Sequence, residues 1–349
     1  MHLALVDDPL FEEHEEPFGH PECRERLNAG RRGLSEGASE LSLARLPARD
    51  ADDSELERVH LKRYVSRVGA LAGRSGELDP DTFFSPLSHD AARRAAGGGV
   101  ALVDALHQGA DYGFGLMRPP GHHALGSSSM GFCIFNNAAV AAAHALTRGV
   151  SRVLIVDWDV HHGNGTEEIF YASKDVLYLS LHQSPFYPGT GAVTDVGSAA
   201  GEGYTVNIPL SARANDSVYA LAFAGVVLPI VRQFAPELTI ISAGYDAHRK
   251  DPLGEMALSE AAFGDMTRAL QRVLPNKGRG NLMFLLEGGY DFEGLGAGIR
   301  ETARALTSSS ASAVTPELHW QEQIQHLPEP WRRELEAARR VQGRYWSFT

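Results

Sequence analysis

The sequence predicts a single α/β domain built on a central, mostly parallel β-sheet with helices on both faces. Short apolar runs alternate with helical patterns through most of the chain. Polar, glycine-containing clusters follow directly after four of these apolar runs. With 349 residues, 43% of them hydrophobic, the chain can form one large core or two ordinary ones. We expect one main domain over residues 1–305, with residues 306–349 as a linker and a terminal helix packed on it or extending it.

The N-terminal part gives the weakest signals. Its first apolar stretch lacks a basic flank and runs into acidic residues, so it does not resemble a secretory signal. Residues 21–70 are charged and have the spacing of helices with a solvated face. Residues 76–86 predict a turn-rich loop with three carboxylates, and residues 89–109 predict an alanine-rich helix that ends near Gly109.

The strand and helix signals then alternate to the C-terminal tail, which predicts a parallel sheet covered by helices. The predicted strands are residues 112–117, 152–158, 176–181, 238–242 and 281–286, and the predicted helices are residues 136–148, 217–235 and 259–274. Residues 307–316 predict a flexible linker, and residues 328–346 predict a helix opened by proline.

The composition excludes several classes of protein. The chain has 32 basic and 44 acidic residues, a formal charge of −12 that repels nucleic acid but not cationic substrates. Its two cysteines, Cys23 and Cys133, show neither a disulfide framework nor the spacing of a thiolate zinc site. No run approaches the roughly 18 apolar residues of a membrane span. We therefore expect a cytoplasmic protein that binds neither nucleic acid nor a membrane.

The chemistry-bearing clusters all lie just past the C-terminal end of an apolar run. In open α/β sheets, ligands bind outside the carboxyl ends of the strands. Residues far apart in sequence would therefore converge on one crevice. The four clusters are RPPGHH (118–123), DWDVHHGNG (157–165), AGYDAH (243–248) and EGGYD (287–291).

The DWDVHHGNG cluster has the residue types of a metal site. In an extended segment Asp157, Asp159 and His161 share one face. Two carboxylates and an imidazole suit a divalent cation, and no lysine or arginine nearby would balance the carboxylates. The alternative is that the acids cap the next helix and His161 is a core histidine. Asp246 is the natural third protein ligand with Asp159 and His161, which would leave a coordination position open for catalysis. Alone, Asp246 would be read as an ordinary turn residue at a strand end.

The RPPGHH cluster supplies candidates for a general acid and a general base. His122 and His123 could exchange protons with a metal-bound water. Asp157 and Asn164 are the obvious partners to orient the two rings. The alternative is that both histidines simply pack in a loop.

Aromatic side chains near glycines could shape a binding tunnel. Tyr290 follows two glycines that allow close approach of a ligand, so it could stabilise a developing oxyanion. Phe132 and Tyr187 lie in glycine-bounded loops and could wall a narrow tunnel, although plain core packing fits them equally well.

These motifs together resemble the histone deacetylase and acetylpolyamine amidohydrolase family, which has the arginase-deacetylase fold. The resemblance covers about residues 18–305, and the order and spacing of six motifs make it specific. The motifs are RPPGHHA, GFCIFNNAAVAA, VDWDVHHGNGTEEIFY, FYPGTG, SAGYDAH and LEGGYD.

The resemblance implies a role for each candidate residue. One Zn²⁺ per chain would be held by Asp159, His161 and Asp246. His123 would be the general base and later the general acid, with His122 as its electrostatic partner, and Tyr290 would polarise the scissile carbonyl. Phe132 and Tyr187 would flank the acylamine channel, and Gly131 would offer its backbone carbonyl to the substrate amide. The family also has potassium sites, here implied at Asp157, Asp159, His161, Ser180 and Leu181.

Two departures from the family pattern define the branch. Asn164 stands where some members have Asp, which fits the class II-like and bacterial branch and leaves the imidazole behind it less basic. The dinuclear manganese branch of the fold has a DxD pair where this chain has Asp246-Ala247-His248. We therefore expect one metal ion and not two.

The expected activity is zinc-dependent removal of an acetyl or other acyl group from acyl-lysine or an acetylpolyamine. The substrate would be a small acylated amine or an acyl-lysine peptide, and the chain could form a homo-oligomer. The alternatives are a dinuclear manganese ureohydrolase and a catalytically silent acyl-amine binding module. Glu77, Asp79 and Asp81 could favour a cationic amine at the entrance, but an exposed acidic loop is the simpler account.

Overall fold

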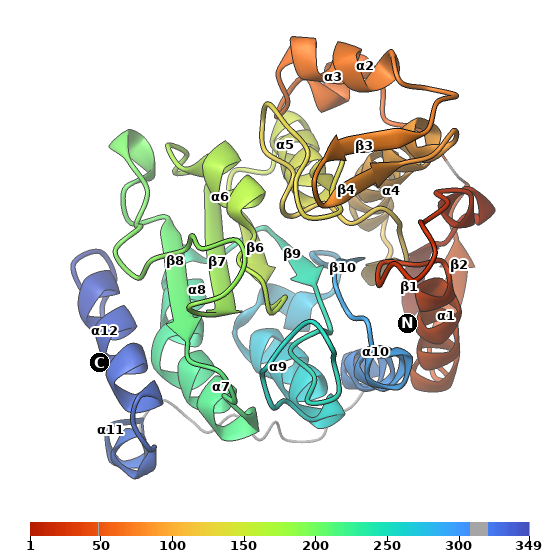
Figure 1. Cartoon of the computed structure of the whole chain (residues 1–349). Helices are drawn as coiled ribbons and strands as arrows, with labels where there is room; N and C mark the ends of the chain where they lie inside the picture. The colour runs from red at the N-terminus through yellow and green to blue at the C-terminus, as the bar shows by residue number, and fades with distance from the viewer. Residues whose placement is uncertain (48, 308–319, 349) are drawn as a thin grey trace.

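The computed structural model describes residues 1–47, 49–307 and 320–348, and Figure 1 shows a layered α/β arrangement. At its centre lies an eight-stranded sheet, ordered β2-β1-β5-β10-β9-β6-β7-β8, in which every neighbouring pair is parallel. The predicted parallel sheet is therefore confirmed. Its strands are β1 (His2–Val6), β2 (Ser42–Arg45), β5 (Tyr112–Gly115), β6 (Val153–Asp157), β7 (Val176–Gln183), β8 (Thr205–Leu210), β9 (Leu238–Ala243) and β10 (Leu282–Leu286).

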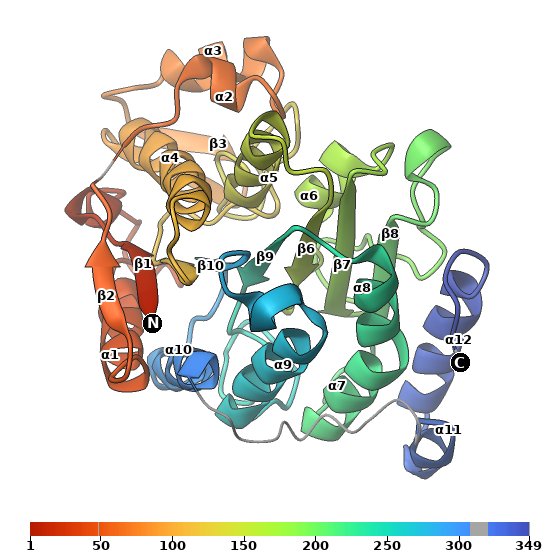
Figure 2. The ribbon, with the colours of Figure 1, turned by 180° about the vertical axis from the view of Figure 1, so that it is seen from behind.

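Helices cover both faces of this sheet, as predicted. Helices α4 and α5 pack on each other over one face, while α1, α10 and α9 form a contiguous row over the other (Figures 1 and 2). The helices are α1 (Glu25–Gly37), α2 (Asp53–Leu56), α3 (Lys62–Gly69), α4 (Ser88–His107), α5 (Asn137–Thr147), α6 (Asn164–Phe170), α7 (Asp216–Ala222), α8 (Leu228–Phe234), α9 (Glu260–Val273), α10 (Phe292–Thr307), α11 (Trp320–Gln323) and α12 (Trp331–Gln342).

Burial on both faces explains why the central strands are apolar without alternation. Every residue of β6 and of β10 is buried, as expected for parallel strands between two helix layers. The five predicted strands all exist, and their ends lie within two residues of the predicted ends. The predicted helices at 89–109, 136–148 and 259–274 correspond to α4, α5 and α9.

The N-terminal prediction was wrong in two places. Residues 76–86 are not only a loop, because β3 (Gly76–Asp79) and β4 (Thr82–Phe84) form an antiparallel pair. The buried Thr82-Phe83-Phe84 run supplies the apolar face that drives this pairing. Residues 21–70 contain α1, α2 and α3, but they also contain strand β2, whose four residues are all exposed and give no apolar signal.

Strands β1 and β8 were also missed. The apolar run of β1 is only five residues long at the chain terminus, yet it pairs with both β2 and β5. In β8 the apolar pattern is interrupted by Asn207 and Pro209. Proline is tolerated there because β8 is the last strand of the sheet.

The stretch predicted as one helix over 217–235 is continuous helix from Asp216 to Phe234, with a π-helical segment at Phe223–Val227 between α7 and α8. By length and composition alone this stretch could cross a membrane, which the sequence analysis did not allow for. Within the fold, however, 78% of its most apolar window is buried. That burial is what the core helix of a folded domain shows.

The C-terminal tail covers the β8 edge of the sheet. Helix α12 lies beside β8 in both views, and the Gln342 side chain donates a hydrogen bond to the Thr205 carbonyl at 3.0 Å (Figures 1 and 2). Pro330 precedes α12, as the sequence predicts. The predicted linker at 307–316 lies almost entirely outside the described residues.

Helices α1 and α10 cross at a point where neither has room for a side chain. A Cβ atom on Gly33 would lie 2.1 Å from the carbonyl oxygen of Gly296, and one on Gly37 would lie 2.3 Å from that of Arg300. Because these neighbours are backbone atoms, a larger residue must push the helices apart. The crossing therefore depends on glycine.

We predict that Gly33→Ala lowers the free energy of unfolding by about 1–3 kcal/mol, since overpacking a tight contact costs that much. The matched control is Gly69→Ala at the end of α3, where the nearest atom to the new Cβ would be a histidine side-chain nitrogen at 3.8 Å. The control should be neutral or gain up to about 1 kcal/mol from helix propensity. Thermal and denaturant unfolding of both variants checks this, and equal stability of the two would disprove the tight crossing.

Candidate metal centre and channel

Four neighbouring strands bring the candidate residues together at their carboxyl ends. In the sheet order β5-β10-β9-β6, the four strands are followed by His122 and His123, by Tyr290, by Asp246, and by Asp159 with His161. Parallel strands end at the same edge of a sheet, so the four sequence clusters meet there.

Asp159, His161 and Asp246 form one compact cluster. Their ligand atoms all lie within 4.8 Å of one another. His161 Nδ1 is 3.1 Å from Asp159 Oδ1 and 3.2 Å from Asp246 Oδ2. Both carboxylates are buried, whereas the histidine is partly open. Among the described residues, this is the one group of three or more such side chains with the spacing of a metal site.

The surroundings of the cluster fit a divalent cation. Asp246 Oδ2 is buried and, although close to His161, makes no hydrogen bond. The other Asp246 oxygen accepts the Val160 N–H at 2.8 Å, and Asp159 Oδ2 accepts the Gly288 N–H at 2.8 Å. Two carboxylates fixed by backbone donors, with a free oxygen between them, form a site that needs positive charge.

Glycines leave the space that this cluster requires. A Cβ on Gly288 would lie 2.0 Å from Asp246 Oδ2, and one on Gly244 would lie 2.1 Å from Asp159 Oδ2. Any side chain at either position would displace a candidate ligand. The geometry of the cluster therefore requires glycine at both positions.

Without a metal ion the cluster holds a proton tightly. Burial opposes a charged His161 imidazole, but the neighbouring Asp159 and Asp246 carboxylates outweigh it and raise the pKa of His161 to about 10. Burial and the Asp159 charge raise the pKa of Asp246. Burial alone would raise the pKa of Asp159, but the His122 and His161 charges lower it well below its usual range.

The two adjacent histidines have different partners. His122 Nδ1 lies 3.0 Å from Asp157 Oδ2, and His123 Nδ1 lies 2.8 Å from Asn164 Oδ1. Burial disfavours charge on His122, but Asp157 and Asp159 raise its pKa well above the usual value. Burial lowers the pKa of His123 well below it, helped by the charges of His122 and His161.

Glu287 was only part of a motif in the sequence, yet it anchors the histidine turn. Its buried carboxylate accepts the N–H groups of Gly121 at 2.7 Å and His122 at 3.1 Å. Burial raises its pKa to about 7. A carboxylate directly after the apolar β10 run was the signal that could have identified it.

Tyr290 is placed by two residues that the sequence did not single out. Asp251 Oδ2 accepts the backbone N–H of Tyr290 at 2.6 Å. Arg26 of α1 donates to the carbonyl of Gly289 at 2.7 Å, and its guanidinium carbon lies 5.0 Å from the Tyr290 ring centre. Burial raises the pKa of Tyr290 well above its usual value, so the phenol stays protonated and can donate. Arg26 carried no pattern of its own, because it stands in a charged helix.

A channel of about 450 Å³ leads to this centre. Its lining includes Gly131, Phe132, Tyr187 and Tyr290 as well as His123 and His161. The Phe132 ring meets the Tyr290 ring edge-on at 6.1 Å, and Tyr187 meets His123 edge-on at 5.3 Å. Phe132 and Tyr187 thus line a cavity as well as pack, and the volume suits a small ligand.

The channel wall at Gly131 and Phe132 is held in an unusual backbone conformation. Their φ angles are 54° and 70°, the left-handed region that a bulky residue such as Phe132 rarely adopts. Thr82 Oγ1 of β4 accepts the Phe132 N–H at 3.2 Å, and Ser129 Oγ donates to Asp79 Oδ2 at 2.6 Å. The unpredicted β3–β4 pair therefore braces this wall. Strain of this kind often marks functional positions.

The remaining candidates lie beside the centre. Ser180 is opposite Asp157 in the β6–β7 pairing, and its hydroxyl is 2.9 Å from His182 Nδ1. Leu181 is fully buried in β7. Of the three acids in 76–86, Asp81 lines the channel, Asp79 is bound by Ser129, and Glu77 is exposed in β3.

Comparison with known proteins matches the chain to one family. The family model described as "Histone deacetylase domain" matches residues 20–306. The chain is 42% identical over 304 residues to histone deacetylase 15 of Arabidopsis thaliana, covering 85% of this chain and 54% of that protein. It is 42% identical over 254 residues to the histone deacetylase-like amidohydrolase of Pseudomonas aeruginosa, covering 71% and 67%.

The crystal structure of the HD domain of HDA15 has the same fold. It matches with a TM-score of 0.89 at 38% sequence identity, covering 99% of this chain and 95% of that one. The present chain spans only about half of the full length of histone deacetylase 15, as the 54% coverage shows.

We predict that the cluster binds one divalent metal ion per chain, with an affinity that rises with pH. Because the pKa of His161 is about 10 without metal, binding near neutral pH must release its proton. The affinity should therefore rise at least about tenfold per pH unit between about pH 6 and 8. It should rise more steeply below about pH 7, where Asp246, whose pKa burial raises to about 7, must also lose a proton. Calorimetric titration in two buffers of different ionisation heat measures both affinity and released protons.

Asp246→Asn should abolish this binding, and Asp81→Asn, which changes an acid in the channel but outside the cluster, should leave it intact. An affinity that does not change with pH, or equal binding by the two variants, would contradict the assigned ligand set.

Proposed function

Because the chain belongs to the histone deacetylase family, we propose that it is a zinc-dependent amidohydrolase that removes an acetyl or other acyl group from an N-acylated amine. The observation that carries the proposal is the shared cavity. His161 of the metal cluster, the neutral His123 and the phenol of Tyr290 all line one channel. An amide hydrolase needs a metal ligand set, a general base and an oxyanion donor around a single carbonyl.

The substrate class follows from the shape and charge of the channel. Aromatic side chains wall it, and its described lining includes two acids, Asp81 and Glu255, but no lysine or arginine. A slim, apolar acyl-aminoalkyl chain with a cationic or peptide end fits such a passage. Both an acyl-lysine peptide and an acetylpolyamine have this form. Gly131 would accept the substrate amide N–H through its carbonyl oxygen.

Asp159, His161 and Asp246 would hold the zinc ion. When bound, zinc polarises the substrate carbonyl and acidifies a water molecule beside it. His123 is neutral because of burial and neighbouring positive charge, so it can accept the proton of the attacking water. It returns that proton to the nitrogen of the departing amine as the amide C–N bond breaks. The products are a neutral amine and a carboxylic acid.

Tyr290 donates a hydrogen bond to the substrate oxygen as negative charge develops on it. Its phenol is kept protonated by burial, and its backbone is fixed by Asp251. His122 stays charged against Asp157 and adds positive potential beside the reacting carbonyl.

The mononuclear form is favoured over a dinuclear manganese ureohydrolase by His248. This residue stands where the dinuclear branch has the second Asp of its DxD pair, and its Nε2 lies 3.5 Å from Glu260 Oε2. A potassium ion at Asp157, Asp159, His161, Ser180 and Leu181 stays a prediction. Cytoplasmic location and a homo-oligomeric state also stay proposals.

We predict that Tyr290→Phe lowers kcat by about 10²–10³-fold, because the loss of one oxyanion donor costs about 2.7–4 kcal/mol. The measurement is turnover of acetyl-lysine peptides and acetylpolyamines by zinc-loaded protein. Zinc content should be unchanged.

Tyr345→Phe is the matched control, since the phenol of Tyr345 donates to Glu202 at the surface. Wild-type turnover by Tyr290→Phe would remove this residue from the mechanism. If the zinc-loaded wild type binds these substrates but cleaves none, the chain is a binding module instead.

We predict that Asn164→Asp moves the acidic limb of the kcat/KM profile to higher pH, by about one pH unit. A carboxylate 2.8 Å from His123 Nδ1 would stabilise the charged imidazole and raise its pKa. Because His123 acts as a base only when neutral, it then needs a higher pH to work. Asn215→Asp, at the cap of α7, is a matched control that should leave the profile unchanged. A limb that stays in place, or moves down, would argue against His123 as the base.

A further inference from the structure

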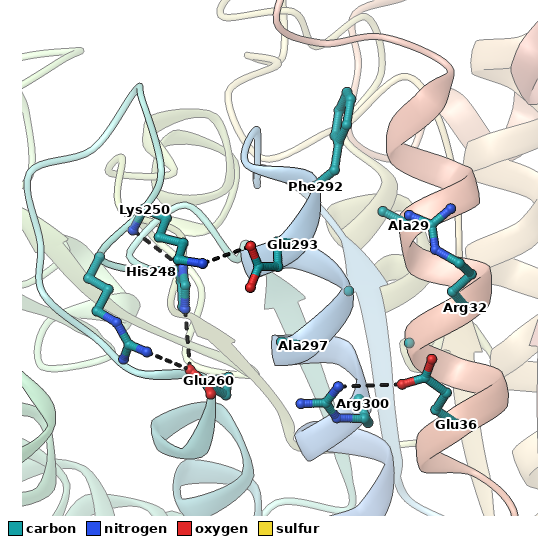
Figure 3. Close-up of a pocket in the computed structure, with 13 residues that line it drawn as sticks. Ala29, Arg32, Glu36, His248, Lys250, Glu260, Phe292, Glu293, Ala297 and Arg300 are labelled. Atoms are coloured by element: carbon teal, nitrogen blue, oxygen red, sulfur yellow. Dashed lines mark hydrogen bonds and ion pairs between the residues drawn. The ribbon is translucent and has the colours of Figure 1, made fainter.

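A second cavity, of about 360 Å³, lies between α1, α10 and the segment 248–250. It shares no lining residue with the channel. Small residues of the two helices line its floor, including Gly33 and Ala29 of α1 and Gly296 and Ala297 of α10. Figure 3 shows charged side chains entering it from both sides.

The charge of this cavity is opposite to that of the whole chain. Its lining has four cations, Arg32, Arg249, Lys250 and Arg300, against the three acids Glu36, Glu260 and Glu293, with His248 in addition. The chain as a whole carries −12. A locally positive cavity in a strongly acidic protein favours an anionic ligand.

The acids of the cavity are already paired, but one cation is not. Glu36 lies 3.4 Å from Arg300, Glu260 lies 3.1 Å from Arg249, and Glu293 lies 2.7 Å from Lys250. Figure 3 draws the Glu36–Arg300 and Glu293–Lys250 pairs as dashed lines. Arg32 makes no ion pair or hydrogen bond with any described residue, and it is exposed at the α1 side of the cavity.

The cavity also has an apolar surface. Phe292, the first residue of α10, is 42% exposed and lines the same cavity. In Figure 3 its ring stands at one end of the cavity, opposite the α1 wall that carries Arg32. A free cation and an exposed ring in one cavity suit a ligand that has an anionic group attached to a flat, apolar part.

We propose that this cavity binds a small organic anion in which a phosphate or carboxylate group is attached to an aromatic ring. The anionic group pairs with Arg32, and the ring packs on Phe292. The bond between Glu293 and Lys250 is no obstacle, because the Glu293 side chain is 77% exposed. Exposed ion pairs of this kind are weak, so an incoming anion can take over Lys250 as a second partner.

The position of the cavity connects it to the metal centre. Its two sides continue the segments that carry Asp246 and Tyr290, because His248 and Phe292 each come two residues later. Asp251, next to Lys250, accepts the N–H groups of both Tyr290 and Asp291. A bound anion would therefore rest on the two segments that position the reaction centre.

The test is direct binding, which does not depend on turnover. Phenyl phosphate is titrated calorimetrically into wild type, Arg32→Glu and Arg63→Glu, with one site per chain expected for wild type. Arg32→Glu should weaken binding by at least about tenfold, since it replaces a charged hydrogen bond by repulsion. Arg63→Glu, an exposed arginine of α3 away from the cavity, should bind as wild type does.

A second pair of probes tests the role of the ring. Phenyl phosphate should bind about three- to tenfold tighter than inorganic phosphate, and Phe292→Ala should remove that difference. Hydrogen exchange should show protection by phenyl phosphate in α1, in 248–250 and at the start of α10.

Three results would overturn the proposal. One is unchanged binding by Arg32→Glu, which would place the anion elsewhere, for instance at the metal centre. Another is protection from hydrogen exchange only in the segments that line the channel. The third is no binding up to about 10 mM, where even a site with a Kd of about 1 mM would be filled.

Discussion

The structure around the reaction centre depends on how buried negative charge is balanced at the carboxyl end of the sheet. Asp157, Asp159, Asp246 and Glu287 are all fully buried within a few strands of one another. Buried carboxylates are costly unless they are paired or hydrogen-bonded. His122 balances Asp157, and backbone N–H groups satisfy Glu287. Only the Asp159 and Asp246 pair faces a partly open imidazole and has an oxygen to spare, so that is where a cation belongs.

Side chains from distant segments fix the parts of the site that must not move. Tyr290 is held through its backbone by Asp251 and through its neighbour Gly289 by Arg26. Phe132 is held in a left-handed conformation by Thr82 from the β3–β4 pair. In each case a side chain from a distant segment bonds to the backbone, so the aromatic ring points into the channel without a bond of its own. Preorganisation of this kind lets the hydroxyl of Tyr290 remain available for a substrate.

The sequence predicted the centre of the fold better than its margins, for a physical reason. Strands buried on both faces, such as β6 and β10, are continuous apolar runs. The edge strand β2 is exposed, and Asn207 and Pro209 interrupt the apolar run of the edge strand β8. The metal cluster was visible because its ligands follow strands that must end at one edge. Thr82, Arg26 and Asp251 were not visible, because a hydrogen bond to distant backbone leaves no local signal in sequence.

Two adjacent histidines have opposite protonation tendencies, and this difference comes from their neighbours and not from their position in the chain. Both rings are buried, and their centres are only 4.0 Å apart. Two positive charges there would therefore repel each other strongly. Asp157 stabilises charge on His122, while the neutral amide of Asn164 offers His123 much less. The first proton therefore goes to His122, and its charge in turn keeps His123 neutral. Two histidines whose pKa values differ in this way supply a fixed positive charge and a free base at one carbonyl, which is what amide hydrolysis requires.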